Sequence, residues 1–201
     1  MSELCSKHEA INLAQGFPDF NVQPQLVEIL EKVNRQNNHQ YAPAQGSLEL
    51  RDAIVKLTKK QYNSWVSSDE ILITSGATEG LYATFLALIN QGDEVLVFDP
   101  SYDSYIPAIT RSGGIPIRIP LVAPDFDYNW KEIRKKITSK TKYIVINNPH
   151  NPLGKVLTKD DFQALKQLVL ENKLTLISDE VYEYISFKDH YSVIQDEELR
   201  N

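Results

Sequence analysis

Four groups of polar and glycine residues along the chain could together bind a small charged ligand. Each group follows a run of apolar residues that is typical of a buried strand. In an open α/β sheet, ligands bind beyond the carboxyl ends of the strands, so side chains at these ends are expected to meet. The four groups are Thr74–Gly80, Asp99–Tyr102, Asn147–Lys155 and Ser178–Tyr182.

The first group has the features of a phosphate site. Gly76 lets a ligand approach the backbone closely, and Ser75 and Thr78 add hydroxyl groups. The N–H groups at the start of the expected helix would favour an anion by roughly 0.3–2 kcal/mol. The glycine spacing fits neither the dinucleotide fingerprint nor a P-loop. A simple capped turn is the alternative interpretation, and this segment taken alone favours it.

The second and third groups offer an aromatic ring and an amide. Tyr102 could present its ring face to a flat aromatic ligand, although a core tyrosine is the commoner role. Asn151 lies between Pro149 and Pro152, which stiffen the loop, and its amide can donate to a phenolate oxygen. A plain turn is the alternative for this loop, and its density of Asn and Pro disfavours that interpretation.

The fourth group combines a carboxylate with a phenol. An apolar run ends at Asp179, and Tyr182 follows three residues later. A partly buried carboxylate needs a cationic partner if it is to stay ionised, and the protonated ring nitrogen of a ligand would be one. A helix-capping Asp beside a core Tyr is the alternative. Together the four groups supply a phosphate cradle, a stacking ring, donors to a phenolate and a counter-ion for a pyridinium, which pyridoxal 5′-phosphate would match.

The elements that must position these groups alternate between strand and helix, which predicts a mostly parallel sheet with crossover helices, an α/β fold of three α/β/α layers. The strands are apolar throughout, so helices should cover both sheet faces, and the helix at 78–90 is apolar enough to be expected buried. Expected strands are 71–74, 94–98, 115–121, 143–147 and 174–178, and expected helices are 24–37, 47–62, 78–90, 102–111, 128–137 and 158–172.

Three smaller features complete the expected structure. An arm at 11–20 should bend at Gly16, Pro18 and Asp19. The helices at 24–37 and 47–62 each carry an apolar stripe, and Ser47 is a plausible N-cap for the second of them. Thr158 and Asp161 resemble a capping box, with Asp in place of Glu.

Composition narrows the class of protein further. The chain has 201 residues and a net charge of −6, which argues against a nucleic-acid partner. Cys5 is the only cysteine, and the four histidines are scattered without the spacing of zinc ligands, so no metal is expected. The N-terminus does not resemble a signal peptide, and no apolar run approaches the ~18 residues that a membrane span needs. We therefore expect a cytoplasmic, soluble protein with no membrane partner.

Six segments occur in a fixed order over residues 11–184: INLAQGFPDF, YAPAQGSLELR, TSGATEGL, DPSYDSY, NNPHNPLGK and SDEVYEY. By these segments the chain resembles the fold type I, class I/II aminotransferases that use pyridoxal phosphate. The amino-acid sequences of the segments are most similar to those of the kynurenine/methionine aminotransferase branch. The resemblance implies an N-terminal arm and small-domain segment at 1–40 and a partial cofactor-binding large domain at 41–201. It implies transamination between an amino acid and a 2-oxo acid, and a homodimer.

The resemblance also implies a role for individual residues. Asp179 would pair with the pyridine nitrogen and, with Tyr182, act in catalysis. Asn151 and Tyr182 would bond the 3′ oxygen of the ring, Tyr102 would stack on the ring, and Gly16 and Asn151 would lie near the substrate carboxylate. The phosphate would be held by Gly76, Ala77, Thr78 and, from the partner subunit, Tyr41.

The same enzymes bind the cofactor through a Schiff-base lysine on a later strand. The chain ends at Asn201 before any such motif, so we expect it to be the N-terminal half of such an enzyme and to be inactive alone. Lys188 superficially resembles the motif but is expected to be solvated, and Lys155 is expected to be structural. The alternatives are a carbon–sulfur lyase or aminocyclopropane-carboxylate synthase of the same fold, or a non-catalytic protein of this fold. A dehydrogenase is disfavoured by the missing fingerprint after Ile73.

Overall fold

The computed structural model describes residues 1–16, 18, 20–36 and 39–200 and divides the chain into two units, Met1–Ala42 and Pro43–Asn201. The first unit contains α1 (Ser2–Lys7) and α2 (Pro24–Asn34), and Pro24 stands in the first turn of α2 as predicted. No residue of α2 is buried, so its apolar stripe faces outward. The predicted end of this helix at Asn37 and the predicted bend at Asp19 lie outside the described residues.

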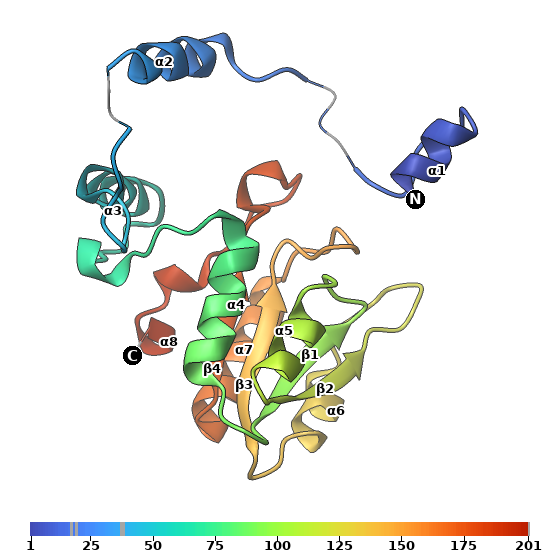
Figure 1. Ribbon diagram of the computed structural model, residues 1–201. Coiled ribbons are helices and arrows are strands. Elements are labelled where there is room, and N and C mark those ends of the chain that lie inside the picture. The colour runs from blue at the N-terminus through green and yellow to red at the C-terminus, as the bar shows by residue number, and fades with distance from the viewer. Residues whose placement is uncertain (17, 19, 37–38, 201) are drawn as a thin grey trace. The chain divides into compact units, whose positions relative to one another are not determined.

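The second unit is built on a parallel sheet, as predicted (Figure 1). Its strand order is β2-β1-β3-β4, and every neighbouring pair is parallel. The chain runs from β1 outward to β2 and then crosses back to β3 on the other side of β1. Such a reversal creates a crevice at the carboxyl ends of the two central strands. The strands are β1 (Glu94–Asp99), β2 (Ile115–Pro120), β3 (Thr141–Asn147) and β4 (Thr175–Asp179).

The predicted strand at 71–74 is wrong. This segment pairs with no strand of the described chain. The N–H of Ile73 instead donates to the carbonyl of Gln45 at 3.1 Å. A strand exists only where a neighbour supplies the ladder of hydrogen bonds, and apolar character alone does not provide one.

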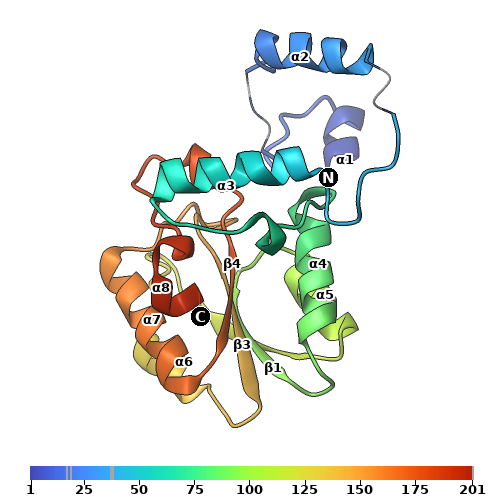
Figure 2. The same cartoon turned by 90° about the vertical axis from the view of Figure 1, so that its left-hand side faces the viewer.

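Helices cover both faces of the sheet, as Figure 2 shows almost edge-on. Side chains alternate between the faces: Val95 and Val97 pack toward α4 and α5, whereas Leu96 and Phe98 pack toward α6 and α7. This confirms the predicted three-layer arrangement. The helices are α4 (Gly76–Leu88), α5 (Tyr105–Arg111), α6 (Trp130–Lys135) and α7 (Lys159–Asn172).

The prediction that the apolar helix α4 is buried holds for one face only. Phe85 is fully buried against the sheet, whereas Tyr82, Leu86 and Leu88 are exposed. A helix that packs on a sheet buries a single stripe, so extra apolar residues around its circumference remain outside. The helix also begins at Gly76, two residues before the predicted start, which places the glycine in its first turn.

The remaining elements of the second unit lie outside the sheet. In α3 (Leu48–Tyr62) the buried residues are Arg51 and Thr58, whereas Leu50 and Leu57 of its apolar stripe are exposed. Ser47 precedes α3 as predicted but makes no side-chain cap. The described residues also form α8 (Glu197–Arg200) and three short 3₁₀ turns, Ser68–Glu70, Glu183–Ile185 and Val193–Gln195.

The start of α7 confirms the predicted capping box. The Thr158 hydroxyl accepts from the N–H of Asp161 at 3.1 Å, and the Asp161 carboxylate accepts from the N–H of Thr158 at 3.2 Å. Asp therefore replaces the longer Glu without loss of either bond. Within the described residues, no helix combines the length and the apolar character that crossing a membrane requires.

Candidate functional site

The loop after β3 is fastened to the end of β4. In the sheet register Asn147 stands opposite Asp179, so the two last residues of neighbouring strands are side by side. The Asn147 amide donates to the Asp179 carbonyl at 3.0 Å, and the Asn147 side-chain oxygen accepts from the N–H of Asn151 at 2.6 Å. A second bond, from the N–H of Asn148 to the Asp179 carbonyl at 2.9 Å, fixes the same junction. Asn151 therefore stands at a defined place beside Asp179.

Asp179 carries a buried carboxylate that has neutral partners. The residue is 8% exposed. One carboxylate oxygen, Oδ2, accepts from the Tyr105 hydroxyl at 2.6 Å, and Oδ1 accepts from the N–H of Val181 at 3.1 Å. None of the ion pairs found among the described residues involves Asp179. A buried carboxylate in this state is suited to a cation supplied by a ligand.

Tyr105 is a hydrogen-bond donor that stays protonated. Burial raises the pKa of its phenol far above the ordinary value, and the bond to Asp179 raises it further. The hydroxyl therefore donates to Asp179 over the whole neutral range of pH.

Two more hydrogen bonds link the aromatic and polar residues around the carboxylate. The Asn151 amide donates to the Tyr182 hydroxyl at 3.2 Å, and the hydroxyls of Thr78 and Tyr102 lie 3.4 Å apart. The ring of Tyr102 packs edge-on against that of Tyr105, with centroids 5.7 Å apart. The first bond connects the loop after β3 with the loop after β4, and the second connects the start of α4 with the loop after β1.

The first turn of α4 is open. Gly76 has φ +81°, and a Cβ placed there would meet nothing within 4 Å. No side chain caps the helix at Ser75, whose own N–H donates to the Glu79 carboxylate. Gly76, Ala77 and Thr78 are all exposed. Their backbone can therefore be reached by an anion from outside, on which the helix dipole acts favourably.

These parts surround one cavity of about 210 Å³. Its lining brings together the residues predicted from three strand ends and one helix start. Gly76 adjoins the lining through Ala77, whereas Gly16 and Tyr41 belong to the unit Met1–Ala42. The cavity is lined by Ala77, Thr78, Leu81, Tyr102, Asn147, Asn151, Asp179, Val181 and Tyr182.

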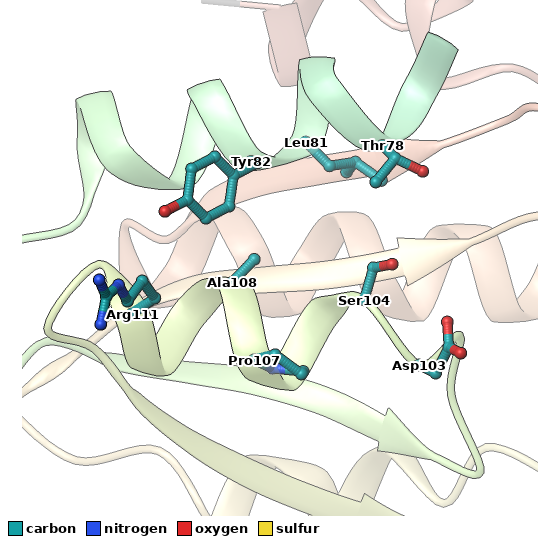
Figure 3. A pocket seen from close by; sticks show the side chains of 8 residues that line it. All are labelled: Thr78, Leu81, Tyr82, Asp103, Ser104, Pro107, Ala108 and Arg111. Carbon is teal, nitrogen blue, oxygen red and sulfur yellow. The ribbon is translucent and has the colours of Figure 1, made fainter.

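A larger cavity of about 490 Å³ lies between α4 and α5. Figure 3 shows Thr78 and Leu81 of α4 across from Ala108 of α5 and from Ser104, which directly precedes that helix. Thr78 and Leu81 line both cavities. The start of α4 therefore lines two cavities.

The sequence analysis did not include Tyr105 in the site, and it included Asn147 in the third group without giving it a role of its own. Tyr105 lies three residues after Tyr102, a spacing that places it at the start of the following helix rather than in the loop. Asn147 is the last residue of β3, and the polar end of an apolar strand is a signal that could have identified it.

The two lysines considered from the sequence are placed as expected. Lys155 donates to the carbonyls of Asp125 and Phe126 at 3.0 and 3.1 Å and pairs with Asp127, so it anchors the neighbouring loop. Lys188 is exposed in a turn closed by Ser186 and does not line the 210 Å³ cavity.

One histidine, His190, lies close to two carboxylates. Possible ligand atoms of Glu180, Glu183 and His190 lie within 4.8 Å of one another. All three already have protein partners: His190 bonds the Asn148 carbonyl at 3.0 Å, Glu180 accepts from the N–H of Val193 at 3.0 Å, and Glu183 accepts from Tyr62. The cluster thus holds the segment around residue 190 against the loop after β3.

Comparison with known proteins identifies the family. The model of the aminotransferase class I and II family matches residues 8–199, so the chain belongs to that family. A methionine aminotransferase of Escherichia coli is 45% identical over 100% of this chain and 53% of its own length. A probable kynurenine–oxoglutarate transaminase of Saccharomyces cerevisiae is 35% identical over 92% of this chain and 45% of its own length.

Solved structures agree with this assignment. A crystal structure of an Escherichia coli protein identified as a methionine aminotransferase has a TM-score of 0.93 and 44% identity, covering 99% of this chain and 53% of that one. An N-succinyldiaminopimelate aminotransferase of Mycobacterium tuberculosis gives a TM-score of 0.89 at 35% identity, covering 94% and 51%. The chain therefore spans about half the length of the relatives it matches.

Proposed function

We propose that the protein containing this chain transfers an amino group between an amino acid and a 2-oxo acid, with pyridoxal 5′-phosphate as its cofactor. The observation that carries the proposal is the buried Asp179 carboxylate, which faces a cavity whose opposite side is an open helix start. Membership of the class I and II aminotransferases supports it. Because the chain spans about half of its relatives, the activity is proposed for the whole protein.

The residues of the cavity fit this cofactor. Asp179 has only neutral donors and lacks a cation among the described residues, so it suits a protonated ring nitrogen. The first turn of α4 offers N–H groups and open space at Gly76 to a phosphate. Asn151 and Tyr182 stand together to reach the phenolic oxygen of the ring, and Tyr102 lines the same cavity to pack against its face.

When bound, the cofactor supplies a ring that withdraws the electrons released as the α-proton leaves the substrate. Asp179 keeps the proton on the ring nitrogen, because a buried anion stabilises the charged form of its partner. Asn151 and Tyr182 orient the ring through its phenolic oxygen. Gly76, Ala77 and Thr78 would hold the phosphate at the start of α4.

We also propose roles for two residues of the first unit. We assign residues 1–40 to an N-terminal arm and a small-domain segment, and Gly16 to the neighbourhood of the substrate carboxylate. Tyr41 of the partner subunit would bond the cofactor phosphate, so the protein acts as a homodimer. Both roles rest on the family resemblance of the segments around Gly16 and Tyr41.

Methionine is the first amino donor to test, since a relative of 45% identity is a methionine aminotransferase. The purified protein is supplied with pyridoxal phosphate, methionine and 2-oxoglutarate, and the products are followed by mass spectrometry. We expect glutamate and the 2-oxo acid of methionine in equal amounts, dependent on the added 2-oxo acid. Release of a thiol without consumption of 2-oxoglutarate would instead demonstrate a carbon–sulfur lyase.

An Asp179→Asn variant is the matched control for this assay. It keeps the size of the side chain and an oxygen that can accept from Tyr105, but it removes the negative charge. Loss of turnover with an unchanged unfolding transition supports the proposed site. Turnover equal to that of the unmodified protein rejects it.

A further inference from the structure

Tyr105 is the strongest polar contact of Asp179, and the proposed cofactor chemistry does not use it. The residue is 2% exposed, and its hydroxyl lies 2.6 Å from the carboxylate oxygen Oδ2. Its bond spans two elements, because Tyr105 begins α5 whereas Asp179 ends β4. The hydrogen bond therefore ties the helix layer to the end of the strand.

The position of the hydroxyl is set by core packing rather than by the site. The Tyr105 ring belongs to the cluster beneath α4 and α5, where it joins Val97, Ile109, Val145 and Ile177. A ring held in such a close-packed cluster has one rotamer available, so its hydroxyl is a fixed point. Tyr105 can therefore impose a geometry on Asp179 rather than follow it.

The two donors to Asp179 fix the orientation of the carboxylate. Val181 N–H holds Oδ1 at 3.1 Å, and the Tyr105 hydroxyl holds Oδ2 at 2.6 Å. With one donor on each oxygen, rotation about the bond to the carboxylate carbon breaks at least one hydrogen bond. The Val181 donor belongs to the backbone, so Tyr105 is the donor that a side-chain substitution can remove.

We propose that Tyr105 is a positioning residue that turns the Asp179 carboxylate toward the ring nitrogen of the cofactor. The inference rests on the proposed function, since it assigns Asp179 to that nitrogen. Tyr105 does not touch the ring in this account; its effect passes through the carboxylate alone. It should consequently matter for a ligand that has the nitrogen and not for one that lacks it.

The test compares two ligands that differ at one ring atom. Pyridoxamine 5′-phosphate and its 1-deaza analogue, which has carbon in place of the ring nitrogen, are titrated calorimetrically into the protein and into Tyr105→Phe. We expect the natural ring to bind the unmodified protein at least about tenfold more tightly than the analogue, because the pair with Asp179 is charge-assisted. Tyr105→Phe should lose most of this preference and bind the analogue almost unchanged.

A tyrosine elsewhere in the same core supplies the matched control. The Tyr143 hydroxyl donates to the carbonyl of Leu88, near the amino end of β3 and so at the other end of the sheet from Asp179. Tyr143→Phe removes a part-buried, hydrogen-bonded hydroxyl and should keep the preference for the ring nitrogen. A partly unfolded sample does not disturb the result, since the preference is a ratio measured on one preparation.

The outcomes separate the inference from the function on which it rests. If neither ligand binds, or if the unmodified protein does not distinguish them, the proposed role of Asp179 fails and the inference fails with it. If the unmodified protein prefers the natural ring and Tyr105→Phe keeps the full preference, the proposed function stands and the positioning role is overturned. Equal weakening of both ligands by Tyr105→Phe also overturns it.

A measurement on the unmodified protein avoids reliance on the variant. Tyrosine labelled with ¹³C at Cζ reports the hydrogen bond of each hydroxyl by NMR. The Tyr105 signal should move when pyridoxamine phosphate binds and stay near its free position with the 1-deaza analogue. Identical movement with both ligands contradicts a path through Asp179.

Discussion

The two sides of the 210 Å³ cavity are built in opposite ways. On the Asp179 side, polar groups are buried and bonded to one another, and the bonds reach the core through Tyr105 and the loop through Asn147. On the α4 side, the backbone of Gly76–Thr78 is exposed and no side chain caps the helix. A buried carboxylate needs hydrogen-bond donors even before a ligand binds, because burial removes it from water. The N–H groups at a helix start can bind the anion of a ligand only if no protein group caps them.

The comparison predicts that removing the buried charge has the largest effect. Asp179→Ala should weaken the binding of pyridoxamine phosphate more than about 100-fold, because it leaves the cationic ring nitrogen buried without a partner. Affinity for inorganic phosphate should not change, since that ligand uses only the α4 side. Calorimetric titration of both ligands checks this. A loss within threefold for pyridoxamine phosphate would show that the buried side does not hold the ring.

The open side should respond to a change at its glycine. Gly76 has φ +81°, so Gly76→Ala strains the backbone and places a methyl group in the space left for the phosphate. We expect pyridoxamine phosphate and inorganic phosphate to lose affinity alike, by about tenfold, within the range of a helix-dipole interaction.

Gly92 is the matched control for that variant. Its φ is +87° and a Cβ would also meet nothing within 4 Å, but it lies in the turn before β1. Gly92→Ala should lower the unfolding free energy by a similar amount and leave both affinities unchanged. If Gly92→Ala weakens phosphate as much as Gly76→Ala does, the effect is backbone strain and the cradle assignment is wrong.

The stacking residue between the two sides should have a smaller effect. Tyr102→Ala removes the ring and should weaken pyridoxamine phosphate about 2- to 12-fold, as expected for loss of an aromatic pair. Tyr102→Phe keeps the ring and loses only the hydroxyl that lies 3.4 Å from Thr78, so it should bind almost normally. Equal losses in the two variants would assign the contact to the hydroxyl rather than to the ring face.

The smallest predicted effect is a dependence of stability on pH, which arises from a histidine buried away from water in the loop after β3. His150 is 4% exposed, and its Nδ1 has no hydrogen-bond partner among the described residues. Burial lowers the pKa of its imidazole, so the folded protein binds a proton less readily than the unfolded chain. Stability from this group is therefore present above the pKa of the unfolded histidine, about 6.5, and falls as the pH drops below it.

Urea unfolding at pH 7.5 and pH 5.5 measures this term. The unfolding free energy should fall between the two values by at most about 1.4 kcal/mol per pH unit from one histidine. In His150→Gln the unfolding free energy should fall less between the two pH values, because the contribution of His150 is missing. An identical fall in the variant would mean that the loop admits water around the imidazole.

The Asp179 side of the cavity could be predicted from the sequence, because a local pattern of residues indicates each strand that forms it. The apolar run before Asp179 predicts β4, and the register with β3 brings Asn151 beside it once both strands are parallel. The bond between Tyr105 and Asp179 could not be predicted. It depends on how α5 packs across the sheet, which no local spacing specifies.

Other sequence-based predictions were wrong for the same reason, because they depend on tertiary packing. The segment 71–74 has the composition of a strand but finds no ladder in the described chain. The apolar stripes of α2 and α3 were recognisable, yet no residue of α2 is buried and α3 buries Arg51 and Thr58 instead. A stripe predicts a face that can be buried; which partner buries it depends on tertiary contacts.

The most direct test of the account is the protonation state of the bound ring. Pyridoxamine 5′-phosphate labelled with ¹⁵N in the ring is bound to the protein and to Asp179→Asn, and the nitrogen is observed by NMR at pH 8. We predict the signal of a protonated nitrogen in the unmodified protein and of an unprotonated one in the variant. The same signal in both, or the absence of binding to the unmodified protein, would contradict the assignment of Asp179 to the ring nitrogen.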